Sequence, residues 1–149
     1  MTVKIAIKYT KAMGQLRRTG DYRTRVGVFD DGRSYPDGTK VIEVAIWNHF
    51  GTQNIPARPF VTASLELARP ELRALYARLV AGVLAGKITD AFAAQYLGQW
   101  AVKEIVDNIN RGLFQANAPS TVASKGSDAP LIDTGQLKAS IRAEVDKVR

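Results

Sequence analysis

Apolar residues recur at three- and four-residue spacing through the middle of the chain, and this spacing constrains the fold more than any other feature. The recurring residues are Leu65, Ala68, Leu72, Leu75, Leu79 and Val83. One face of an α-helix repeats at this spacing, so the pattern predicts a helix that buries one side. Pro70 suits the first turn of this main helix, with a shorter helical turn before it.

A second long helix is expected over residues 90–110. Thr89 is a suitable N-cap for it, and Arg111-Gly112 marks its end. Its expected buried side chains are Ala93, Leu97, Trp100, Ile105 and Ile109. Two adjacent helices of this length can bury a core in a chain of 149 residues, which suits a single domain over residues 1–149.

Both ends of the chain alternate apolar and polar residues, as half-buried strands do. The alternation covers residues 3–8, 22–29 and 140–148; in the second of these, Tyr22, Thr24, Val26 and Val28 share one face. The chain is therefore expected to have an α+β fold. A small, mostly antiparallel sheet from the N-terminal and C-terminal strands packs against two long helices.

Four other segments are read from composition. Residues 41–50 fit either a short helix or a strand. Pro56 and Pro59 predict a rigid, non-helical strap over residues 55–60. Residues 30–40 have turn composition and are expected to form a mobile loop, which could reach a neighbouring subunit. Residues 115–130 are rich in Ser, Ala, Gly and Pro and are expected to form a long loop that orders on assembly.

The net charge of +7 is uneven, because residues 1–40 hold nine Lys and Arg against four Asp. A basic N-terminal third suggests an acidic partner or passive contact with DNA phosphates; the alternative is a solvated strand face. The candidate DNA-facing residues are Arg17, Arg18, Arg23, Arg25 and Arg33. No recognisable DNA-binding module accompanies them.

Several kinds of chemistry are excluded by composition. The chain has no cysteine and a single histidine, His49, so the usual zinc ligands are missing. It has no nucleophile elbow and no phosphate-binding loop, and His49 is expected to be a packed or surface residue. We expect no enzyme activity and no cofactor. No apolar run is long enough to span a membrane, and residues 1–8 do not form a signal peptide.

Two motifs about seventy residues apart point to assembly. The first is FGTQNIPARPF at residues 50–60, and the second is PLIDTGQL at residues 130–137, which runs on to Ser140-Ile141. Together they resemble the tail-completion and head–tail joining proteins of tailed bacteriophages, a family that includes the Mu-like virion-morphogenesis proteins and the minor tail protein Z. The resemblance covers roughly residues 41–145.

The resemblance implies a structural protein of the virion neck or tail, assembled in the cytoplasm of the host bacterium without a cofactor. Its partners would be other copies of itself in a ring around the DNA channel, a hexamer by analogy with the six-fold tail, and the neighbouring connector and tail proteins. It also favours a helix over residues 41–50. The family's recurrent positions are Phe50, Gly51, Pro56, Arg58, Pro59, Phe60, Asp133, Thr134, Gly135, Leu137, Ser140 and Ile141. His49 stands where the family often has an acidic residue.

Alternatives stay open at several of these positions. Asp133-Thr134-Gly135 also occurs in aspartic proteases, which need two such carboxylates. Only fourteen residues follow Gly135, so a helix cap, with Asp133 and Gln136 forming a capping box, is the favoured interpretation. Arg58 fits either an intrachain ion pair or a contact with another subunit or with DNA. For the whole chain, the alternative function is a basic nucleic-acid-binding accessory protein.

Overall fold

The computed structural model describes residues 2–6, 21–114 and 135–148. The elements in chain order are β1 (Thr2–Ala6), β2 (Asp21–Val28), α1 (Val41–Phe50), α2 (Phe60–Leu67), α3 (Arg69–Leu84), α4 (Asp90–Asn110), α6 (Gln136–Ala139) and β3 (Ile141–Val148). The expectations for Arg17, Arg18, Asp133, Thr134 and the loop 115–130 lie outside the described residues.

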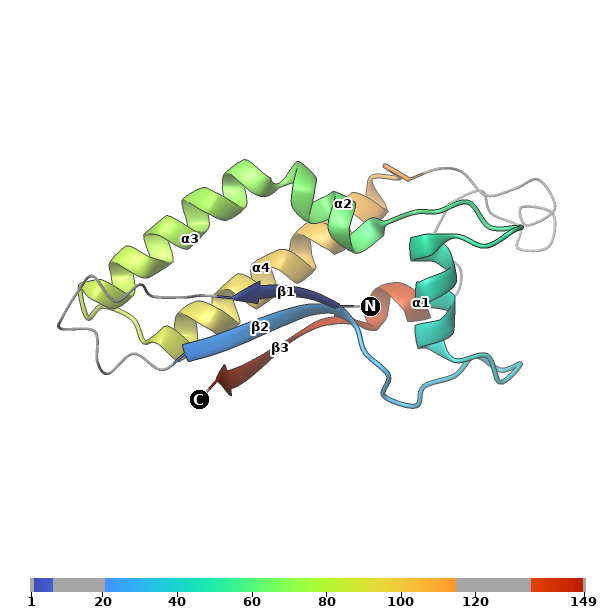
Figure 1. Ribbon diagram of the computed structural model, residues 1–149, viewed down its shortest axis with the longest axis horizontal. Helices are drawn as coiled ribbons and strands as arrows, with labels where there is room; N and C mark the ends of the chain where they lie inside the picture. Colours follow the sequence, from blue (N-terminus) through green and yellow to red (C-terminus); the bar gives the residue numbers. More distant parts are fainter. Residues whose placement is uncertain (1, 7–20, 115–134, 149) are drawn as a thin grey trace.

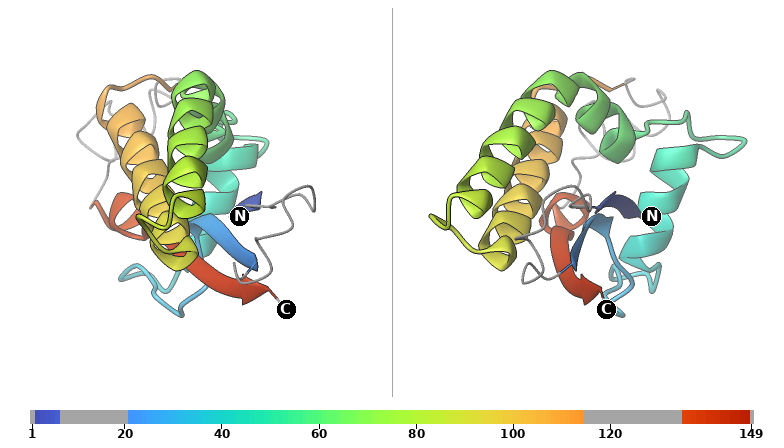
Figure 2. Two further views of the ribbon diagram at one scale, coloured as in Figure 1. Left: turned by 90° about the vertical axis from the view of Figure 1, so that its left-hand side faces the viewer. Right: turned by 60° about the vertical axis from the view of Figure 1, so that its left-hand side comes forward.

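The sheet has the strand order β1-β2-β3, and both pairs are antiparallel. The N-terminal and C-terminal ends of the chain therefore meet in one sheet, with Thr24 opposite Val145 and Val26 opposite Ala143. Helix α4 packs across β2 and β3, and α3 packs against α4 (Figures 1 and 2). This arrangement confirms the α+β fold expected from the sequence.

Helix α4 lies very close to the sheet because Gly98 has no side chain. A Cβ at Gly98 would lie 2.7 Å from the Cβ of Ala143 and 3.0 Å from Cγ2 of Thr24. Thr24 also donates from Oγ1 to the carbonyl oxygen of Ala94, at 3.1 Å. Thr24 is buried, so this bond satisfies a hydroxyl that would otherwise cost free energy inside the core.

The helix boundaries follow the sequence signals. Pro70 lies in the first turn of α3, and α2 is the shorter helix before it. Thr89 caps α4 by accepting a hydrogen bond from the backbone N–H of Phe92, at 3.1 Å. After α4, Gly112 has a φ of 66°, which stops the helix.

Two clusters of buried side chains form the core. The larger cluster joins the sheet, α1, α2 and the second half of α4, and includes Val26, Phe60 and Ile105. The smaller one lies between α3 and the first half of α4, around Leu79 and Leu97. Trp100, expected to be buried, is instead partly buried and packs against both clusters, because it lies at the margin where they meet.

Residues 41–50 form a helix, as the resemblance favoured. The strap that follows is shorter than expected, since Phe60 is already the first residue of α2 and Pro59 is its N-cap. The loop over residues 30–40 is held by turns and by a bridge between Ser34 and Lys40. Its mobility and its reach to another subunit stay predictions.

Candidate functional site

The first motif forms a tight reversal after α1. Gly51 has φ 78° and ψ 169°, a backbone conformation in which essentially only glycine is found. A Cβ there would lie 2.9 Å from the backbone nitrogen of Ala57 and 3.0 Å from the carbonyl oxygen of Ile55. Thr52 closes the reversal, because its N–H donates to the carbonyl oxygen of Ile55 and its Oγ1 accepts from the N–H groups of Asn54 and Ile55.

Arg58 fixes the returning strap to α1. Its backbone N–H donates to the carbonyl oxygen of Asn48 at 2.6 Å, and its Nη1 donates to Oδ1 of the same residue at 3.0 Å. Asn48 is held in turn by a bond from Nδ2 to the carbonyl oxygen of Val44. Arg58 is only 3% exposed, and this burial lowers the pKa of its guanidinium group. Arg58 thus makes an intrachain contact, and its burial argues against the DNA-facing or inter-subunit role.

His49 is packed inside the same corner. Its ring is buried and meets the rings of Phe50 and Phe60 edge-on, with centroids 4.8 and 5.5 Å away. Nε2 lies 3.5 Å from Oγ1 of Thr62, whereas Nδ1 is buried with no hydrogen-bond partner among the described residues. Burial lowers the pKa of His49 to about 4, so the ring is neutral at physiological pH.

The outer side of α1 carries an exposed apolar surface, which we call the α1 stripe: Ile46, Trp47 and Phe50. These side chains are 40%, 40% and 64% exposed. They lie on the side of the helix opposite Val41, Ala45 and His49, which face the core. The first motif therefore buries Arg58 and Phe60 and leaves its first aromatic residue on the surface.

The second motif meets α1 from the other end of the chain. Its last turn, α6, contacts α1, and Leu137 and Ile141 belong to the same buried cluster as Phe60 of the first motif. Leu137, Ser140 and Ile141 are buried, and the Oγ of Ser140 donates to the carbonyl oxygen of Leu137 at 2.6 Å. The helix begins at Gln136 with Gly135 as its N-cap, at a φ of 79°, whereas the capping box required Asp133 in that position.

The basic residues of β2 and the following loop belong to a chain of ion pairs with alternating sign. Its members, in order, are Arg33, Asp31, Arg142, Glu144, Arg25 and Asp146. The guanidinium nitrogen and carboxylate oxygen of neighbouring members lie 2.8–3.4 Å apart. Hydrogen bonding from Arg33 holds the pKa of Asp31 well below its usual range. We call this chain the charge ladder.

Because of the charge ladder, the outer face of the sheet is not the basic surface that was expected. Arg25 and Arg33, expected to face DNA, are paired with carboxylates of the same chain. Arg142 and Arg25 also lie over the ring of Phe29, at 4.9 and 5.6 Å from its centroid. Arg23 pairs in register with Asp146 on β3, and its side chain forms no ion pair with the residues that the structure describes. The outer face therefore carries both signs of charge.

The described part of the chain holds neither a metal site nor a membrane-spanning helix. Residues 2–6, 21–114 and 135–148 contain no group of three or more His, Cys, Asp or Glu residues that could hold a metal ion. Among the helices of these residues, none combines the length and the apolar character that a membrane crossing needs.

Sequence reasoning missed Asn48 as the partner of Arg58 and did not decide whether Trp47 is exposed. The exposure of the α1 stripe, in contrast, was indicated by the sequence. Ile46, Trp47 and Phe50 recur at helical spacing, out of phase with Val41 and Ala45, and two apolar faces on one helix cannot both be buried at the edge of a fold.

Comparison with protein-family models, with curated proteins and with solved structures finds no match to this chain.

Proposed function

We propose that this chain is a structural assembly protein of the neck or tail-completion type, which oligomerises at the head–tail junction of a tailed phage. The proposal starts from the resemblance of the two motifs. It is supported by one observation above all: the motif region is built around buried residues, yet it presents an apolar stripe to solvent.

Exposed apolar surfaces of this kind commonly mark protein–protein contacts. Aromatic side chains, and tryptophan above all, often contribute most of the binding free energy at such contacts. The stripe also lies on a well-supported element, because Gly51, Thr52 and Arg58 fix the strap behind it. A surface that is ordered before binding loses less entropy on association.

The proposal assigns the chain no chemical step and no cofactor. The alternative of a nucleic-acid-binding accessory protein is less well supported, because Arg25 and Arg33 already have carboxylate partners. Phosphate groups would have to compete with these partners before they gained any electrostatic free energy.

The test uses a phage that encodes this chain. Loss of the gene should leave filled heads and separate tails in electron micrographs, and supplying the wild-type chain should restore joined particles. The variant Phe50→Glu should fold but fail to restore them. Leu67→Glu is the matched control, since Leu67 is 65% exposed and lies outside the stripe. Normal particles in the absence of the gene would refute the proposal.

A further inference from the structure

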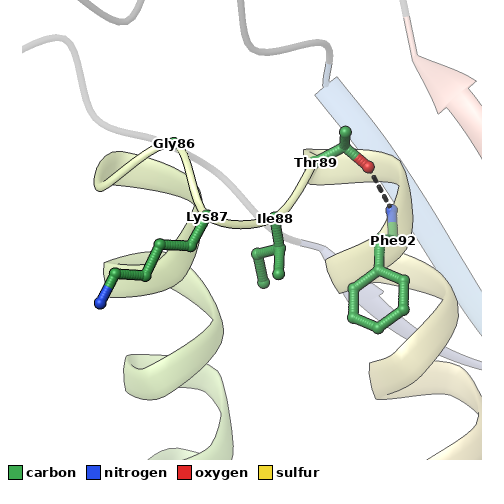
Figure 3. A pocket seen from close by; sticks show the side chains of 5 residues that line it. All are labelled: Gly86, Lys87, Ile88, Thr89 and Phe92. Carbon is green, nitrogen blue, oxygen red and sulfur yellow. Dashed lines mark hydrogen bonds between the residues drawn. The ribbon is translucent and has the colours of Figure 1, made fainter.

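A second apolar surface lies at the turn between α3 and α4. A hollow of about 370 Å³ is lined by Gly86, Lys87, Ile88, Thr89 and Phe92 (Figure 3). Ile88 points into the space between the two helices, and the ring of Phe92 lies beside it, over α4 (Figure 3). We call this hollow the hairpin groove.

Aromatic surface continues from the groove along α4. Phe92 is 49% exposed and Tyr96 is exposed to a similar extent, and their ring centroids are 6.0 Å apart. Leu84, at the end of α3, is also exposed. The hollow is shallow and open to solvent over most of its extent, and its aromatic wall offers a surface against which a large apolar side chain of another protein can pack.

The hairpin groove and the α1 stripe lie far apart on the molecule. Figure 1, drawn with the longest axis horizontal, places α1 towards one end and the α3–α4 turn at the other. One surface is the convex side of a helix, and the other is a hollow between two helices. A single copy cannot bring them together, but two copies can.

One exposed charged residue lies beside each surface, and the two residues have opposite signs. Glu43 is exposed one turn before Ile46 and Trp47 on the same side of α1. Lys87 is exposed at the groove and points along α3, away from Phe92 (Figure 3). In the part of the chain that the structure describes, salt bridges involve neither residue, although Glu43 accepts a hydrogen bond from the backbone N–H of Lys40.

We propose that the α1 stripe of one copy docks into the hairpin groove of the next copy, with Glu43 facing Lys87. The inference rests on the assembly function proposed above and names the contact between copies. Because two different surfaces meet, each copy keeps one free stripe and one free groove. Such a head-to-tail contact continues from copy to copy and closes into a ring or extends as a filament, and it cannot close as a two-fold dimer.

Light scattering over a range of protein concentrations tests the contact, using two variants that each disable one half. Trp47→Glu removes a functional stripe, and Phe92→Glu removes a functional groove. The wild type should form larger species as its concentration rises, whereas each variant alone should stay at the chain mass of 16.3 kDa. An equimolar mixture of the two variants should form a species of two chains and stop there, since it contains one intact stripe–groove pair.

Two further sets of variants serve as controls. Leu67→Glu should keep the wild-type mass distribution, because Leu67 is exposed outside both surfaces. Glu43→Lys and Lys87→Glu should each weaken association about two- to fivefold, as expected for an exposed charge pair. The double variant should recover the wild-type value. These charge reversals are at exposed positions, so they test the contact even if the replacement of Trp47 or Phe92 disturbs folding. Glu43 also accepts a hydrogen bond from the backbone N–H of Lys40, so far-UV circular dichroism checks that each variant keeps its helices.

The proposal is wrong if the wild type stays at the single-chain mass, if Phe92→Glu associates like the wild type, or if the mixture of variants gives no two-chain species. Failure here is distinguishable from failure of the proposed function. A chain that is monomeric in solution but still required for head–tail joining would refute the stripe–groove contact and leave the function standing.

Discussion

At the residue scale, Gly51 is a position where the backbone does not accept a side chain. Its conformation at φ 78° and ψ 169° excludes other residues, and a Cβ would press against backbone atoms of Ala57 and Ile55, which cannot rotate away. Two separate costs therefore fall on the same substitution, one from the dihedral angles and one from the contact.

We expect Gly51→Ala to lower the free energy of unfolding by about 2–4 kcal/mol, measured by urea denaturation. Gly32→Ala is the matched control, because Gly32 has a similar φ of 79° but no atom within 4 Å of the added Cβ. The control should cost about 1 kcal/mol. Equal losses for the two variants would contradict the role given to the close contact.

His49 makes a prediction about pH. Its pKa is lowered to about 4 by burial, against 6.5 for an unperturbed ring, so the unfolded chain takes up a proton before the folded chain does. Stability is therefore full above about pH 6.5, is lost as the pH falls from 6.5 towards 4, and changes no further from this residue below that.

Between pH 7 and pH 5 the wild type should lose about 2 kcal/mol of unfolding free energy, measured by urea denaturation at each pH. His49 is the only histidine, so His49→Gln should flatten the curve over this window. A variant that keeps the full wild-type pH dependence would contradict the assignment to His49.

At the element scale, the strap is held to α1 by a small number of polar contacts. Arg58→Ala removes the bond to Oδ1 of Asn48 and leaves a buried gap, so we expect a loss of about 2–4 kcal/mol in unfolding free energy. Hydrogen exchange of residues 51–59 should become faster in the same variant.

Arg69→Ala is the control for Arg58→Ala. Arg69 also bonds a neighbour, Glu66, but about half of its side chain is exposed, so its removal should cost less than about 1 kcal/mol. If both arginine variants lose the same small amount, the strap is not held by Arg58.

The helices and strands were predictable because their signals are local. Thr89, Pro70 and the three- and four-residue spacing of the apolar side chains set α3 and α4 without reference to the rest of the chain. Helix α1 was ambiguous from its own residues, and the resemblance was needed to favour a helix. The Gly51 reversal that ends the helix lies beyond its last residue.

The polar partners were not predictable, because they depend on distant segments. Arg25 meets Glu144 and Asp146 only after β3 has paired with β2, and a shift of one residue would move its side chain to the opposite face from theirs. Arg58 meets Asn48 only because the strap reverses at Gly51. Composition counts such charges without showing which of them are already paired.

At the scale of the whole molecule, the charge ladder limits how the chain meets nucleic acid. We expect the double variant Arg25→Ala, Arg33→Ala to bind duplex DNA within about twofold of the wild type in fluorescence anisotropy, and with the same salt dependence. If both arginines contacted phosphates, their loss would reduce the slope of log affinity against log salt by about 1.8. A reduction of that size would restore these residues as a DNA-facing surface.

The close approach at Gly98 has a consequence for the shape of any assembly. With no side chain at this point, α4 is held against Thr24 and Ala143, and the Thr24 bond fixes it one turn earlier. Helix α4 thereby acts as a stiff strut, about 30 Å long for its 21 residues, between the turn that it shares with α3 and the corner beside α2. A strut that cannot slide on its sheet fixes the angle between the two ends of a subunit. Copies joined end to end would then repeat a single curvature, and that curvature would determine the diameter of any ring that they closed.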